Sequence, residues 1–140
     1  MFEKNTGELR NELRSEKEIA RFIERNENEM VTSSVADMLE ELLKKYDEKQ
    51  KTVIKRSMIQ TTYAYQIFEG RKNASRDKLL RLALAFPLTI ADTNRLLRQG
   101  GYNDLYVRNK RDVLLIYSIE KKLGVGNANE LLYSNGEELL

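Results

Sequence analysis

Apolar residues recur at intervals of three or four along most of this chain, and Pro87 is its only proline. That spacing places apolar side chains on one face of an α-helix, whereas a half-buried strand would need them at alternate positions. No stretch alternates cleanly over the length of a strand. The 140 residues are enough for one compact domain with a core of its own. The pattern therefore predicts an all-α protein.

Residues that start and stop helices divide the chain into segments. Ser34 and Ser75 are suited to cap the N-termini of helices, and Gly70 and Pro87 are suited to end them. The expected helices are Thr6–Arg25, a helix after Ser34, Gln50–Ser57, Thr61–Glu69, a helix from Ser75 to Pro87, one opened by Thr89 or Asp92 and stopped by Gly100, then Asn109–Leu123 and Asn127–Leu140.

Charge is concentrated in the middle of the sequence. Residues 49–111 hold 14 of the 24 Lys and Arg but only four Asp and Glu, a net charge of +10. The segments on either side, 1–48 and 112–140, carry net charges of −5 and −3. The overall charge of +2 thus conceals a basic centre, which is the electrostatic pattern expected of a surface for a phosphate backbone.

Two short helices in this basic centre have the features needed to read DNA. The major groove admits one α-helix, which needs a polar outer face and an apolar inner face. Helix 61–69 meets that need, because Ala64, Ile67 and Phe68 can face inward while polar residues face out. The candidate base contacts are Gln60, Thr61, Thr62, Tyr65 and Gln66. The candidate phosphate contacts are Gln50, Lys51, Lys55, Arg56, Arg71, Lys72, Asn73, Ser75 and Arg76.

The same residues give the segment a family resemblance. It resembles the XRE-type (phage repressor and Cro-like) helix-turn-helix family in the residues Gln50, Ile59, Gln60, Tyr63, Ile67, the connector Gly70–Ser75 and Leu79-Leu80-x-Leu82-Ala83. The resemblance implies a five-helix repressor-like bundle over roughly Val35–Gln99, with extra N-terminal and C-terminal helices. It also implies that Gln50 contacts phosphate and that Gln60 caps the helix entering the major groove.

Some positions depart from the family pattern. Met58 stands where the turn normally carries glycine, and a left-handed backbone there would cost Met about 1–2 kcal/mol. Ile54 replaces a small residue between the two helices, Phe68 replaces a common Glu, and Ala74 replaces the connector proline. Met58 and Ile54 motivate an alternative function, a protein-interaction adaptor or antitoxin-like inhibitor that binds DNA weakly or not at all.

The expected domain organisation has three parts. Residues 1–30 form an N-terminal helix or arm, 31–101 the DNA-binding domain, and 102–140 C-terminal helices that pack on the core or mediate oligomerisation. The arm has an apolar stripe that either packs on the chain's own body or contacts a partner, formed by Leu9, Leu13, Ile19, Phe22 and Ile23. Arg108, Lys110 and Arg111 either extend the basic patch or cap the next helix.

Composition excludes several other functions. The chain has no Cys and no His, which removes thiol chemistry, the commonest general base and the commonest metal ligand. No nucleophile motif or cofactor fingerprint occurs, so we expect no enzyme activity, no cofactor and no metal site. No apolar run is long enough to cross a membrane, and we expect a cytoplasmic location. The sequence therefore predicts a transcriptional regulator, a repressor in our interpretation, that binds double-stranded DNA as a homodimer, with a protein partner as the alternative.

Overall fold

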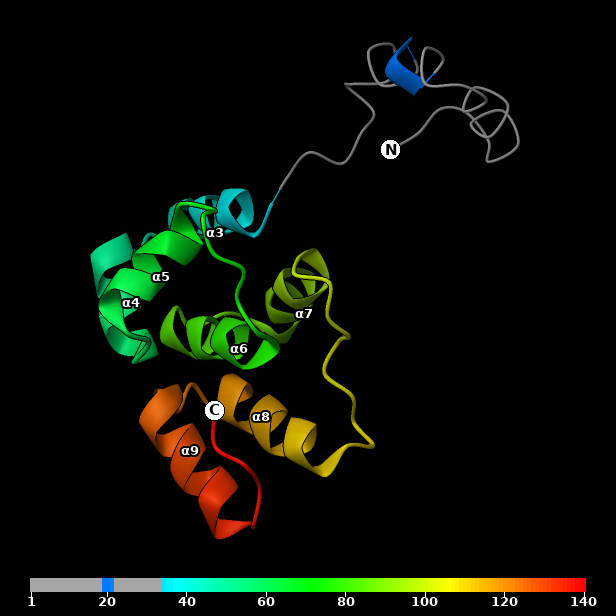
Figure 1. Cartoon of the computed structure of the whole chain (residues 1–140). Coiled ribbons are helices and arrows are strands. Elements are labelled where there is room, and N and C mark those ends of the chain that lie inside the picture. The colour runs from blue at the N-terminus through cyan, green and yellow to red at the C-terminus, as the bar shows by residue number, and fades with distance from the viewer. Residues whose placement is uncertain (1–18, 22–33) are drawn as a thin grey trace. The chain divides into compact units, whose positions relative to one another are not determined.

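The computed structural model describes residues 19–21 and 34–140 (Figure 1). Residues 19–21 are helical, and the rest of the expected N-terminal helix Thr6–Arg25 lies outside the described residues. Residues 33–140 form one compact unit, which is described here by itself. The described residues contain helices and no strand, which confirms the all-α prediction.

Seven helices follow one another in the compact unit. They are α3 (Val35–Lys45), α4 (Gln50–Ser57), α5 (Thr61–Phe68), α6 (Arg76–Ala85), α7 (Ile90–Gln99), α8 (Lys110–Glu120) and α9 (Gly124–Ser134). Short polar side chains cap four of them at the N-terminus, because each oxygen accepts a hydrogen bond from a backbone N–H of the first turn. These caps are Ser34, Ser75, Thr89 and Asn109.

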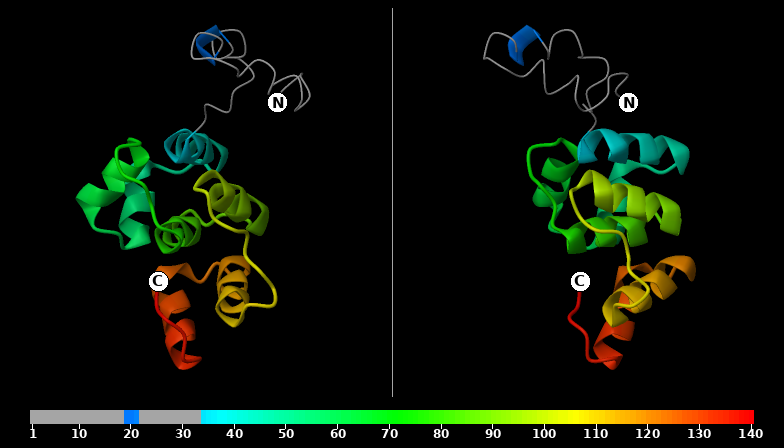
Figure 2. Two further views of the ribbon diagram at one scale, coloured as in Figure 1. Left: turned by 45° about the vertical axis from the view of Figure 1, so that its right-hand side comes forward. Right: turned by 90° about the vertical axis from the view of Figure 1, so that its right-hand side faces the viewer.

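Helix α6 is the centre of the unit. It contacts α4, α7, α8 and α9, and in Figures 1 and 2 it lies between the α3–α5 group and the α8–α9 hairpin. Six of its ten residues are buried, namely Leu79, Leu80, Leu82, Ala83, Leu84 and Ala85. A helix buried on most of its circumference requires such a run of apolar residues. Pro87 lies just beyond it, as expected from the sequence.

The last two helices differ from their expected bounds. Helix α8 ends at Glu120 rather than Leu123, because Lys122 adopts a left-handed backbone with φ 54°. Helix α9 begins at Gly124 rather than Asn127, and Val125 in its first turn is buried. It ends at Ser134, so residues 135–140 are not helical but return along the hairpin.

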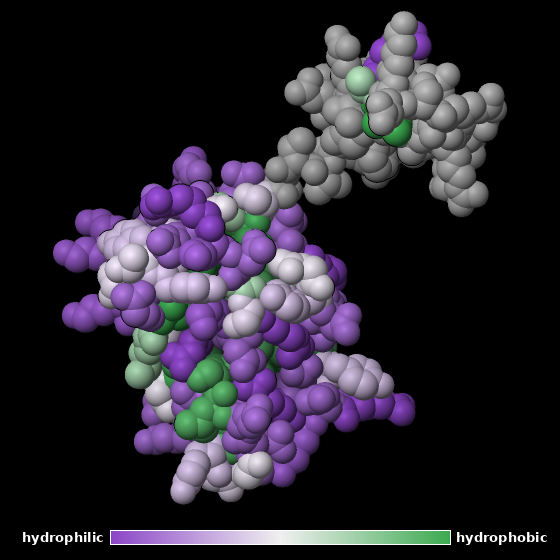
Figure 3. All heavy atoms as spheres, viewed as in Figure 1, coloured by the Kyte–Doolittle hydropathy of each residue, from purple (hydrophilic) through white to green (hydrophobic). Residues whose placement is uncertain are grey.

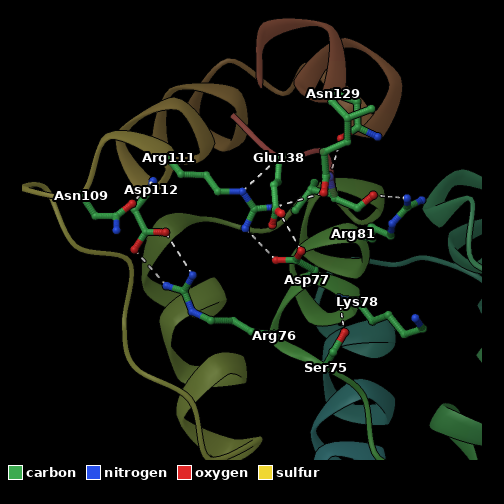
Figure 4. Close-up of polar contacts among 12 residues, drawn as sticks. Ser75, Arg76, Asp77, Lys78, Arg81, Asn109, Arg111, Asp112, Asn129 and Glu138 are labelled. Carbon is green, nitrogen blue, oxygen red and sulfur yellow. Dashed lines mark hydrogen bonds and ion pairs between the residues drawn. The ribbon is translucent and has the colours of Figure 1, made fainter. Parts of the chain in front are cut away.

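Two adjacent ion pairs fasten the α8–α9 hairpin to the start of α6 (Figure 4). The Arg76 guanidinium donates to both carboxylate oxygens of Asp112, at 3.0 Å each. The Arg111 guanidinium donates to both oxygens of Asp77, at 2.9 and 3.0 Å. The hydrogen bond with Asp77 is the main reason that the pKa of Arg111 is raised. Each of the two helices therefore supplies one Arg and one Asp to the two ion pairs. Both pairs are bidentate, which is the strongest geometry for an Arg–carboxylate contact.

A second ionic cluster joins α3 to α7 around the buried carboxylate of Asp92. This carboxylate accepts hydrogen bonds from Lys45 Nζ at 2.8 Å, the Tyr46 hydroxyl at 2.6 Å and the Arg95 guanidinium at 3.1 Å. Burial alone would raise the pKa of Asp92, but these three hydrogen bonds outweigh it and hold that pKa below its ordinary value. The charged form of Asp92 is therefore favoured in the folded protein.

This lowered pKa predicts a pH dependence of stability. Because the folded-state pKa lies below the unfolded value of about 3.9, the stabilisation is present above that value and is lost as the pH falls through the folded-state pKa. Asp92→Asn should lower the free energy of unfolding by about 1–3 kcal/mol at pH 7. The difference between the two proteins should shrink below about pH 4, measured by urea unfolding from pH 2.5 to 7. A difference that stays constant across that range would contradict the prediction.

Candidate nucleic-acid interface

A tight turn of three residues joins α4 to α5. The Ser57 hydroxyl, which is buried, donates to the Ile54 carbonyl at 2.6 Å and accepts from the Ile59 N–H at 3.2 Å. Ile59 is buried beside it, so the turn is anchored from inside by one apolar and one polar side chain. Arg81 of α6 donates to the carbonyls of Ser57 and Met58, at 3.4 and 3.2 Å. The direction in which α5 leaves the turn is thus set by side chains of two helices.

Met58 occupies the left-handed position of this turn. Its backbone has φ 57° and ψ 22°, and its side chain is 63% exposed. Met58 therefore has the left-handed conformation that was expected at this position, where the family pattern carries glycine, although Met58 has a Cβ. Glycine adopts this region without that steric cost. The turn holds its shape against the local preference of Met58.

Replacing Met58 with glycine should therefore stabilise the protein. Relief of the left-handed conformation should exceed the small packing loss and the added backbone entropy of glycine, and raise the free energy of unfolding by up to about 1 kcal/mol. Met58→Ala is the matched control, because it removes the same exposed side chain and keeps the strained backbone. Urea unfolding should give a gain for Met58→Gly alone, and equal values for the two variants would contradict the prediction.

The outer face of α5 presents most of the candidate base contacts. Thr61, Thr62 and Tyr65 are exposed, and Gln66 is half-buried, while Ala64 and Ile67 on the other face are buried. Gln60 has a different role, since its side-chain oxygen accepts from the Tyr63 N–H at 2.7 Å and caps α5. This cap agrees with the role that the resemblance implied for Gln60. It uses the side-chain oxygen of Gln60 and leaves the side-chain NH2 group for other contacts.

Several candidate phosphate contacts are exposed cations around α5. Lys51 and Lys55 on α4 and Lys72 after α5 are exposed, and none of the three makes an ion pair with another described residue. Arg71 is also exposed, and it pairs with Glu69 at 2.7 Å. Exposed pairs of this kind contribute little to stability, so a phosphate can compete for the guanidinium.

The other candidate phosphate contacts differ in their exposure and in the hydrogen bonds and ion pairs that they make within the protein. Gln50 begins α4 and is half-buried, and the exposed Arg56 pairs with Glu48 at 2.9 Å. Ser75 accepts from the Lys78 N–H as the cap of α6. Asn73 is exposed, and its backbone carbonyl accepts from the Tyr63 hydroxyl at 2.7 Å.

Arg76 is bound inside the protein. Its guanidinium is held by Asp112, and it also donates to the carbonyls of Asn103 and Asp104 at 3.4 and 3.3 Å. The side chain is 25% exposed and that of Asp112 only 8%. A phosphate would have to replace a bidentate carboxylate to bind here. We therefore leave Arg76 out of the surface that is proposed below to bind DNA.

Two residues near α5 were not identified from the sequence. Arg81 supports the turn, as described above. The Lys78 ammonium lies 5.2 Å from the centre of the Tyr63 ring, and Tyr63 in turn holds the connector through Asn73. Both residues lie on α6 next to buried leucines, where a charged residue looks like part of the solvent-facing side of a helix. No local signal in the sequence distinguishes them.

The distribution of polarity agrees with an interface over α4 and α5. The face seen in Figure 3 is mainly hydrophilic over these helices, and apolar atoms gather around the C-terminal end of the chain instead. The part of the chain that the structure describes has no group of His, Cys, Asp and Glu suited to a metal ion. None of its helices combines the length and apolar character needed to cross a bilayer.

Comparison with known proteins gives no relative for this chain. No protein-family model, no curated protein and no solved structure matches it.

Proposed function

We propose that this chain is a sequence-specific DNA-binding transcriptional regulator, acting as a repressor, whose helix α5 enters the major groove. In this proposal α4, the turn and α5 form the helix-turn-helix. The observation that carries it is the exposed polar face of α5 beside cations that no described carboxylate neutralises, Lys51, Lys55 and Lys72. A solvent-facing helix needs polar residues, but it does not need cations without a described ionic partner on both of its sides.

Base reading would come from the exposed side chains of α5. Threonine offers a hydroxyl to a base edge or a methyl to thymine, and glutamine pairs with adenine through two hydrogen bonds. Thr61, Thr62 and Gln66 carry these groups on the outer face. Tyr65, which is 36% exposed, can reach a phosphate or stack on a base. Gln60 would act chiefly as the cap that orients α5.

Backbone contacts would come from both sides of α5. Lys51 and Lys55 lie on α4, and Arg71, Lys72 and Asn73 follow α5, so a groove occupied by α5 would have donors along both of its edges. Tyr63 would keep the connector in place through its hydrogen bond to Asn73. As a dimer, the protein would place two copies of α5 about 34 Å apart on a pseudo-palindromic site.

The first test is a fluorescence titration of a random-sequence duplex between 50 and 200 mM salt. Four phosphate-binding cations predict a slope of log K against log salt of about −3.6, hence a loss of affinity of roughly 100-fold over that range. Such a slope would justify selecting the preferred site from a random library. Absence of binding at 50 mM salt would overturn the proposal and favour the protein-interaction adaptor, to be sought by pull-down.

A further inference from the structure

A cleft of about 660 Å³ lies beside the turn that joins α4 to α5. Its walls come from three segments that are distant in the sequence, namely the turn with the start of α5, the first half of α6, and Leu140. Clefts that bind small molecules have volumes of about 300–1,000 Å³. This cleft is therefore large enough to hold a small organic molecule.

Lys78 contributes a positive charge to this cleft that no described carboxylate neutralises. Its side chain is half-buried, and its ammonium makes no ion pair or hydrogen bond with another described residue. It lies 5.2 Å from the centre of the Tyr63 ring, which also lines the cleft. Asp77 is a further lining residue, but both of its carboxylate oxygens accept from Arg111. Partial burial of a charge without an ionic partner is unfavourable, so Lys78 would stabilise an anion in the cleft.

Arg81 and Gln60 add further hydrogen-bond donors to the cleft. Arg81 follows Lys78 by three residues, so their Cβ atoms lie about 5–6 Å apart on one face of α6, and Figure 4 shows both side chains on the same side of that helix. The guanidinium has five N–H donors, and three of them are bonded to two carbonyls of the turn and to the Leu140 carbonyl. The other two donors remain for a ligand. Gln60 caps α5 with its side-chain oxygen, which leaves its NH2 group as a neutral donor.

The cleft also has an apolar part. The Met58 side chain, which is 63% exposed, lines it together with Ile59, the Tyr63 ring and Leu140. Contact between this surface and the apolar part of a ligand would remove apolar area of both from water. A ligand that uses all the groups of the cleft must therefore combine an acidic group with an aliphatic or aromatic body.

We infer that this cleft binds a small organic anion, a carboxylate or a phosphate monoester with an apolar body. Lys78 and Arg81 bind the acidic oxygens, and Met58 and the Tyr63 ring contact the body. The ligand then shares Arg81 with the turn, because the same guanidinium holds the carbonyls of Ser57 and Met58. The site itself does not depend on DNA binding. If α5 reads DNA as proposed, a molecule bound here contacts the turn that orients it.

The test is an NMR titration of the ¹⁵N-labelled full chain, without DNA and at constant ionic strength. Phenyl phosphate and benzoate are the two ligands, and they separate phosphate from carboxylate recognition. At least one of them should cause saturable shifts of the N–H signals of Met58, Ile59 and Lys78. We expect a dissociation constant in the millimolar range, as is typical of ligands with about ten non-hydrogen atoms. Benzyl alcohol, which has the ring without the acidic group, should cause no saturable shifts at these residues.

Two variants connect the binding to Lys78. Lys78→Met keeps the length of the side chain but removes the ammonium, and it should weaken binding of the better ligand at least fivefold. Lys44→Met is the matched control, because Lys44 is an exposed lysine on α3 and its loss should leave the affinity unchanged. The same spectra show whether each variant is folded. Inorganic phosphate should bind the wild type at least fivefold more weakly than the better ligand, because it lacks an apolar body.

Three outcomes would overturn the inference. The first is a wild type that shows no saturable shift with either ligand up to about 50 mM, and the second is a folded Lys78→Met protein that binds as tightly as the wild type. The third is benzyl alcohol or inorganic phosphate that binds as tightly as the better ligand, which would indicate a purely apolar cleft or a site for simple anions. All these measurements are made without DNA, so their failure is distinguishable from a failure of the proposed function.

Discussion

Asp112→Ala is expected to lower the free energy of unfolding by about 3 kcal/mol. The substitution leaves the Arg76 guanidinium without its carboxylate, and it removes the acceptor of the Tyr106 N–H, which lies 2.9 Å from Asp112. Removing one partner of a buried pair costs about 3–5 kcal/mol, and we expect the low end because Arg76 is a quarter exposed. Urea unfolding followed by circular dichroism measures the effect.

Asp104→Ala is the matched control for this prediction. Asp104 pairs with Arg98 at 2.9 Å, but both side chains are exposed, at 43% and 58%, so the expected loss is below about 1 kcal/mol. The double variant Arg76→Ala/Asp112→Ala should lose less than the sum of the two single variants, because the second change removes a charge that is already unpaired. An Asp112→Ala protein as stable as the control would show that the Arg76–Asp112 pair contributes little to holding the hairpin.

The double variant Lys51→Ala/Lys72→Ala should bind random-sequence DNA roughly 100-fold more weakly at 50 mM salt. Each lysine that leaves the interface reduces the number of released counterions by about one, so the slope of log K against log salt should become shallower by about two units. The control Lys44→Ala/Arg98→Ala removes the same charge from exposed positions on α3 and α7. It should keep the wild-type slope, and an equal loss in both double variants would indicate only a response to overall charge.

The contribution of base contacts can be separated from the contribution of phosphate contacts. Thr62→Ala/Tyr65→Ala should remove the preference for a selected site over random DNA, at about 1–3 kcal/mol for each lost base contact, and leave the salt slope nearly unchanged. Loss of slope without loss of preference would assign these residues to the backbone instead of to the bases.

The order of the helices and most of their starts could be predicted because their signals are local. Ser34, Ser75 and Thr89 each lie beside an apolar run and accept from the first turn of the helix that follows. Met58 was expected at the left-handed position because the family that the segment resembles carries glycine there, and its φ is positive. Caps and turns depend on neighbours within four residues, so the sequence alone carries their physics.

Other features depend on residues far apart in the chain. Arg76 follows a candidate DNA-reading helix and was interpreted as a phosphate ligand, yet its partner Asp112 lies 36 residues away. For Arg111 the sequence left two roles open, extending the basic patch or capping the next helix. The structure shows a third role, the ion pair with Asp77. Helix α9 was expected three residues too late because Gly124 and Gly126 resemble helix breakers, whereas burial of Val125 and Ala128 against the core favours the helix. No short-range pattern encodes these pairings.

The last described residues of the chain complete the support of the turn between α4 and α5. The Leu140 carbonyl accepts from Arg81, the same guanidinium that holds Ser57 and Met58, and the carbonyls of Glu138 and Leu139 accept from Arg111 (Figure 4). A ribosome adds about 5–20 residues per second, so several seconds separate the synthesis of α5 from that of residue 140. During that interval the nascent chain already carries α5 but lacks the contacts that hold its turn from the C-terminal side. If α5 reads DNA as proposed, its turn would gain this last support only after synthesis has passed the hairpin.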